Sequence, residues 1–185
     1  MIALVIVIVI VVVVAVAFWS IYNSLVRRRL QVDNAWSQID VQLKRRHDLI
    51  PNLVESVKGY MQYEQQTLQN VIQARQAAVA AAPQGPQAQA QAENVLTGAL
   101  RQLFAVSEAY PDLKANQNFL NLQEELTSTE DRISYSRQFY NDQVQKFDTK
   151  IQSFPTSIIA GMFHFEKREF FQAEEVSTAV PKVEF

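Results

Sequence analysis

The sequence contains no cysteine and only two histidines, so it lacks thiolates and has few imidazoles for metal binding or nucleophilic catalysis. Without cysteine there are no disulfides, no thiolate metal ligands and no thiol nucleophile. His47 and His164 do not form a ligand-spaced pair, and no histidine follows Glu124, Glu125 or Glu130 at the spacing used by di-metal sites in helical bundles. We therefore predict no cofactor, no metal site and no enzymatic activity.

Strand patterning and strong net charge are also missing. The formal net charge of the 185 residues is −2, which is too close to neutral to indicate a nucleic-acid partner. No polar–apolar alternation of period two persists, and the chain has only four glycines. The length suits one domain plus an anchor. The predicted fold class is all-α.

The longest uninterrupted apolar run lies at the N-terminus. Residues 2–18 carry no polar side chain, and the apolar character extends to Ile21. About 20 residues in a helix cover the roughly 30 Å of a bilayer core. Interfacial aromatic residues and a basic cluster follow, as is typical of the end of a span. We predict a single transmembrane helix over residues 1–22, with these membrane-interface residues: Trp19, Tyr22, Arg27, Arg28 and Arg29.

A cleaved signal peptide is the alternative, because Ala15-Val16-Ala17 matches a small-x-small cleavage site. In a signal peptide, however, the positive charge precedes the apolar run, whereas here it follows. We therefore favour a retained anchor. Because basic residues stay on the cytoplasmic side, the same asymmetry predicts an outer N-terminus and a cytoplasmic domain.

Apolar residues recur every three or four positions from Val32 to Ala82, which predicts one long helix. Arg46 and Glu64 fill two gaps in the stripe. The pattern keeps its phase through Pro51, so we predict a bend there rather than a reversal at Leu49–Ile50. A helix of about 50 residues would be a rod of about 75 Å. The expected core includes Trp36, Ile39 and Leu43.

Two further helices complete the predicted domain, residues 23–153. Pro83-Gln84-Gly85-Pro86 is a breaker cluster, and we assign the connection to residues 83–92, with Ala/Gln tips packing weakly. A second helix containing Leu103 ends near Tyr110, and Pro111 marks a stop and restart. The third keeps helical spacing from Phe119 to Ile151, with core positions that include Phe119, Leu126 and Tyr140.

The role of Pro111 leaves two architectures. If Pro111 reverses the chain, an antiparallel, four-helix-bundle-like domain forms and the C-terminal tail ends away from the membrane. If it only bends the chain, a long hairpin brings the tail to the lipid headgroups. We favour the bundle, because a two-helix hairpin buries too little apolar surface to explain three apolar stripes.

The C-terminal segment, residues 154–185, holds six of the eleven phenylalanines. A short helix is predicted over Ser157–Phe165. Such an aromatic segment packs either on the bundle or against lipid, and we favour the bundle. The basic cluster Lys44-Arg45-Arg46 is interpreted as a solvated helix face, since lipid contact would require a tilted domain.

Several segments resemble the LemA family in collinear order. They are Tyr22-Asn23-x-Leu25-Val26, residues 35–46, Asp48-Leu49-Ile50-Pro51-Asn52-Leu53-Val54, residues 108–116, Leu122-Gln123-Glu124-Glu125-Leu126, Thr129-Glu130, Tyr140-Asn141 and Pro181-Lys182-Val183-x-Phe185. The resemblance implies a bacterial membrane protein with one span and a cytoplasmic bundle, usually of four helices. The fourth helix comes either from a split at Pro51 or from the C-terminal segment, and we favour the latter.

The family resemblance implies no catalytic residues. We expect a membrane-anchored scaffold or adaptor in the bacterial inner membrane, and alternatively a self-assembling, membrane-shaping protein. The expected partners are the lipid bilayer and unidentified proteins, with a homo-oligomer possible and no nucleic acid.

Overall fold

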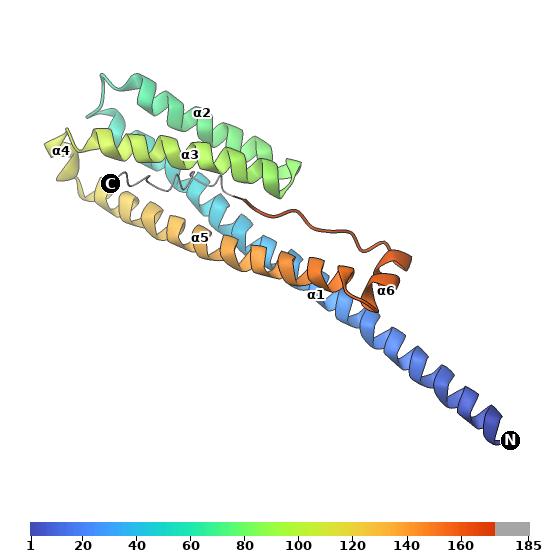
Figure 1. The fold of residues 1–185 in the computed structure, drawn as a ribbon. Helices are drawn as coiled ribbons and strands as arrows, with labels where there is room; N and C mark the ends of the chain where they lie inside the picture. Colours follow the sequence, from blue (N-terminus) through green and yellow to red (C-terminus); the bar gives the residue numbers. More distant parts are fainter. Residues whose placement is uncertain (173–185) are drawn as a thin grey trace, which may run out of the picture. The chain divides into compact units, whose positions relative to one another are not determined.

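The computed structural model describes residues 1–172, and all regular structure in this part of the chain is helical (Figure 1). The predicted all-α class is therefore confirmed. The chain divides into two compact units. Among the described residues, the first contains Met1–Ile39 and Gln138–Arg168, and the second contains Asp40–Arg137 and residues 169–172.

Helix α1 spans Ile2–Lys58 and continues through Pro51 without a break. The predicted continuity at Pro51 is thus correct. The side chains of residues 2–20 are exposed, and this part of α1 is long and apolar enough to cross a membrane. In lipid a helix satisfies its own backbone hydrogen bonds, which suits a run of valine and isoleucine despite their modest helix propensity in water.

The single helix predicted from Val32 to Ala82, and with it the 75 Å rod, is wrong. Helix α1 ends at Lys58, and α2 begins after a turn and spans Gln65–Ala81. The apolar pattern continues across this turn, because the turn residue Met61 is fully buried, as is Val57 in the last turn of α1. Gly59, a poor helix former, is the local signal of the break.

The connection between α2 and α3 is shorter than predicted. It consists of the 3₁₀ turn Ala82–Gln84 and Gly85, and α3 spans Pro86–Ser107. Gly85 has a φ of 103°, a left-handed conformation that glycine adopts without strain. Helices α2 and α3 lie side by side (Figure 1). The Ala/Gln tips are not weakly packed, because four of their residues are buried: Ala78, Ala81, Gln89 and Ala90.

Pro111 reverses the chain. It begins the short helix α4, Pro111–Lys114, and α5 follows over Gln117–Gln152. The rings of Phe104 on α3 and Phe119 on α5 lie 6.3 Å apart, so α5 returns along α3. The favoured compact bundle is therefore confirmed. Its core contains Ile50, Leu53, Val57, Met61, Leu68, Val71, Ala74, Ala78, Leu96, Leu100, Leu103, Leu113, Phe119 and Leu126.

Besides the short α4, the second unit has four longer helical segments: the end of α1, α2, α3 and the start of α5. The fourth helix thus arises where the predicted first helix divides, at residues 59–64. It comes neither from a split at Pro51 nor from the C-terminal segment.

In the first unit, the second half of α5 packs along α1, and the rings of Trp36 and Tyr140 are 5.3 Å apart. Helix α6 spans Thr156–Met162 and overlaps most of the short helix predicted over Ser157–Phe165. The bundle prediction also placed the C-terminal segment away from the membrane, and this part is wrong. Phe163 packs on Tyr22 of α1, at the end of the apolar run. Because α5 has 36 residues, it is long enough to complete the bundle and still run along α1. The C-terminal segment was predicted over residues 154–185, and its last 13 residues lie outside the described part of the chain.

Candidate functional site

The core positions taken from the sequence fall into three groups. The side chain of Trp36 is half-buried, and Pro51 and Pro111 are exposed and act through the backbone. The others are buried, each with at most 3% of the residue exposed: Ile39, Leu43, Leu103, Phe119, Leu126 and Tyr140.

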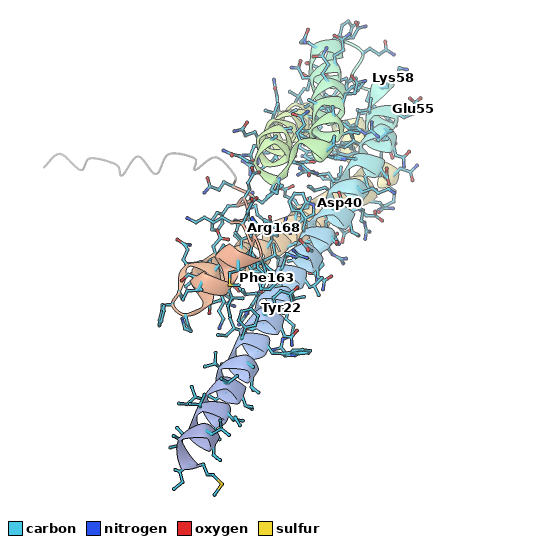
Figure 2. The ribbon with its side chains drawn as sticks, turned by 90° about the vertical axis from the view of Figure 1, so that its right-hand side faces the viewer. Tyr22, Asp40, Glu55, Lys58, Phe163 and Arg168 are labelled. Atoms are coloured by element: carbon cyan, nitrogen blue, oxygen red, sulfur yellow. The ribbon has the colours of Figure 1, made fainter. Side chains whose placement is uncertain are left out.

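Four aromatic residues meet where the apolar part of α1 ends, and we call them the aromatic cluster: Phe18, Tyr22, Phe163 and Phe165. The Phe163 ring centroid lies 4.7 Å from that of Tyr22 and 5.9 Å from that of Phe18. Phe165 lies 6.0 Å from Tyr22. Figure 2 shows Phe163 at the end of α6 beside Tyr22 on α1. The cluster joins the C-terminal segment to the end of the span.

The turn after α6 directs both phenylalanines toward Tyr22. His164 has a φ of 53°, and the Phe165 N–H donates to the Ala160 carbonyl at 2.9 Å, as at a helix end closed by a left-handed residue. Farther on, the Arg168 guanidinium pairs with Asp33 at 2.8 Å, and the backbone N–H of Arg168 donates to the Asp148 carboxylate at 3.1 Å. These contacts hold the segment along α1 and α5.

Of the predicted interface residues, Tyr22 and Arg29 contact the C-terminal segment. The Arg29 guanidinium carbon lies 5.5 Å from the Phe165 ring centroid, a cation–π distance. Arg28 donates to Gln31 at 3.3 Å, and Arg27 and Trp19 are exposed. The concentration of phenylalanine after residue 153 was the sequence signal for Phe163 and Phe165. Nothing in the sequence indicated that they would contact Tyr22 on α1.

A second site lies inside the bundle, and we call it the ion-pair cluster: Arg46, His47, Glu93, Thr97 and Glu130. Arg46 pairs with both Glu93 and Glu130, and donates to the Thr97 hydroxyl at 3.0 Å. His47 Nε2 lies 2.7 Å from the other Glu93 carboxylate oxygen. An ionised carboxylate only accepts hydrogen bonds, so this nitrogen carries the proton. The cluster links α1, α3 and α5.

Burial of Glu93 by itself raises the pKa of its carboxyl group. The hydrogen bond from His47 and the positive charge of Arg46 outweigh this effect, so the pKa is lowered from the ordinary 4.5. Glu93 is therefore ionised at neutral pH and compensates Arg46. A buried guanidinium without such a partner would be strongly destabilising.

The predicted solvated face is wrong for Arg46, because only 2% of this residue is exposed. Its neighbour Arg45 does lie at the surface, 3.5 Å from Glu125. The signal was present in the sequence, since Arg46 occupies a position in the apolar stripe of the first helix.

An open groove of about 910 Å³ lies between the end of α1 and the start of α2, and we call it the α1–α2 groove. Buried Met61 and Leu68 are among its apolar residues, and Glu55 and Lys58 contribute charges of opposite sign. Tyr63 also lines it and is 95% exposed. Sequence reasoning missed this groove, because the predicted continuous helix left no turn to form it.

Comparisons with a family model and with known proteins both identify the LemA family. The LemA family model matches residues 35–185. The protein LemA of Metamycoplasma hominis is 30% identical over 156 residues, 83% of this chain and 70% of the relative. Magnetosome protein MamQ 2 of Paramagnetospirillum magneticum is 25% identical over 175 residues. Magnetosome protein MamQ of Magnetospirillum gryphiswaldense is 22% identical over 174 residues. This chain spans 64% of the length of each magnetosome protein. The chain belongs to the LemA family.

Proposed function

We propose that this protein is a non-enzymatic, membrane-anchored scaffold or adaptor that binds a partner protein through the α1–α2 groove. The observation that carries the proposal is Tyr63, a large aromatic side chain that is 95% exposed at the edge of this groove. Tyrosine is enriched among the residues that dominate protein interfaces, because it contributes a large apolar area and one hydroxyl group.

The composition of the groove also suits a protein partner. Its apolar floor lies beside the side chains of Glu55 and Lys58, and this combination is typical of a contact with an apolar centre and a polar rim. We place the bundle in the bacterial cytoplasm and the span in the inner membrane, because Arg27–Arg29 follow the apolar run. The magnetosome relatives are named for a cellular structure rather than a reaction, which supports a non-enzymatic role.

Site-specific photocrosslinking in intact cells tests the proposal. A photoreactive phenylalanine analogue replaces Tyr63, and a matched variant carries it at Tyr135, which is 71% exposed on α5 of the same unit. We expect a discrete crosslinked protein from position 63 and none from position 135. Equal crosslinking from both positions, or none from position 63, would contradict a binding site at the groove.

Self-assembly is the alternative function, and one observation favours it. Ile72 and Val79 are 39% and 47% exposed on α2, and their spacing of two turns places them on one face. Such an apolar pair suits contact with a second copy of the chain. A photocrosslinker at Val79 that yields a homodimer, together with a detergent-solubilised particle larger than a monomer, would support assembly. A monomeric particle would contradict it.

A further inference from the structure

We infer that α6 and its flanking residues form a second membrane contact, which inserts into the lipid headgroup region beside the point where α1 leaves the bilayer. The segment lies in the first unit, together with the membrane-spanning part of α1. The inference does not rest on partner binding at the α1–α2 groove.

The first observation is an exposed apolar face. Ile158 and Met162 lie four residues apart in α6 and are 58% and 61% exposed, and Phe154, in the turn before α6, is 82% exposed. Within α6, Ile159 and Ala160 are buried instead, so the helix turns one apolar face to the protein and another outward. Residues 151–165 contain no aspartate, glutamate, lysine or arginine. A short surface helix that faced water would normally carry polar residues on its outer face.

The second observation fixes the depth of this face. Phe163 directly follows α6 and contacts Phe18 and Tyr22, with ring centroids 5.9 and 4.7 Å away. These are the residues with which the apolar run of α1 ends, at the expected height of the headgroups. A side chain packed on them shares their surroundings (Figure 2). The medium around α6 is therefore the boundary between headgroups and acyl chains.

The basic residues near this apolar face also support contact with lipid. Arg27, Arg28 and Arg29 lie within about two turns of Tyr22, and Arg29 stacks over Phe165. An apolar surface next to a basic cluster suits an anionic leaflet, where interfacial helices bury an apolar face and place cations near the phosphates. The continuity of this face with the span argues for lipid as the occupant rather than a soluble protein.

The test uses the full chain, whose lack of cysteine permits single labels without further changes. Spin labels are placed at Ile158→Cys and Met162→Cys in protein reconstituted into vesicles of equal parts phosphatidylcholine and phosphatidylglycerol. The control is Gln38→Cys, an exposed position on α1 about 24 Å beyond Tyr22 by helical rise. Collision with molecular oxygen reports lipid surroundings, and collision with a water-soluble nickel complex reports water.

We expect the labels at positions 158 and 162 to favour oxygen over nickel by at least tenfold relative to position 38. Accessibility to nickel equal to that of position 38 would overturn the inference. Protection that disappears when the protein is diluted with excess lipid would also overturn it, because a second copy of the chain would then be the occupant. Circular dichroism of each variant verifies that the helices are retained.

Discussion

Arg46 and Glu93 form an ion pair in which only 2% and 4% of the respective side chains are exposed. The pair connects α1 to α3 inside the bundle, and His47 donates to the same carboxylate. Removing two charges from water is costly, and the cost is offset here by several directed hydrogen bonds. Removing only one partner leaves the other charge buried and uncompensated. We therefore expect this change to lower the free energy of unfolding by more than the intact pair contributes to it.

Replacing the Glu93 carboxylate tests this expectation. Glu93→Gln should lower the free energy of unfolding by about 3–5 kcal/mol, because it leaves a buried guanidinium with Glu130 as its remaining carboxylate. Denaturant unfolding in detergent, followed by circular dichroism, measures the change. The control is Glu125→Gln, which removes a surface pair with Arg45 whose side chains are about half exposed, and should cost less than about 1 kcal/mol. Equal losses would contradict the role of the buried pair.

The lowered pKa of Glu93 predicts a pH dependence with a definite sign. The unfolded chain takes up the proton more readily than the folded one, so the stabilisation is fully present above about pH 4.5 and is lost as the pH falls through the folded pKa below it. Unfolding should be measured for the wild type and Glu93→Gln from pH 7 downward. The difference between them should shrink below pH 4.5, because protonated glutamate resembles glutamine. A difference that grows on acidification would reverse the assignment.

The buried Ala/Gln run predicts sensitivity to insertion. One alanine inserted after Gln91 rotates Gln89 and Ala90 by about 100° relative to Glu93, so these buried residues no longer share a face. We expect a loss of about 3 kcal/mol or more in unfolding free energy. The same insertion after Gln62, which is exposed in the turn between α1 and α2, should cost less than about 1 kcal/mol. Tolerance at both places would mean that the α2–α3 contact contributes little.

Orientation is tested by thiol labelling, because the natural chain contains no cysteine. Gln84→Cys, at an exposed position in the turn before α3, should be protected from an impermeant reagent in intact cells and labelled after lysis. Neutral replacements of Arg27, Arg28 and Arg29 together should give a mixed population, because these charges supply the main orientation signal. Labelling of Gln84→Cys without lysis would place the domain outside.

Periodicity predicted helices reliably and their ends poorly. The positions of Ile39, Leu43, Phe119 and Leu126 follow from a local rule, because residues three and four apart share a helix face. The turn after Lys58 escaped this rule. Its buried residue Met61 continues the apolar pattern, and nothing in the local spacing distinguishes a helix from a turn that also faces the core.

The sequence by itself determined the helical class, the apolar span and the lack of a cysteine-based or histidine-paired site. Each depends on residue type or on short-range spacing. Only the tertiary structure decided that Arg46 is buried against Glu93, and that Phe163 packs on Tyr22. These pairs are 47 and 141 residues apart, and such contacts depend on where the turns place whole helices. No local pattern contains that information, because the free energy of burying a charge or a ring depends on the surface that covers it.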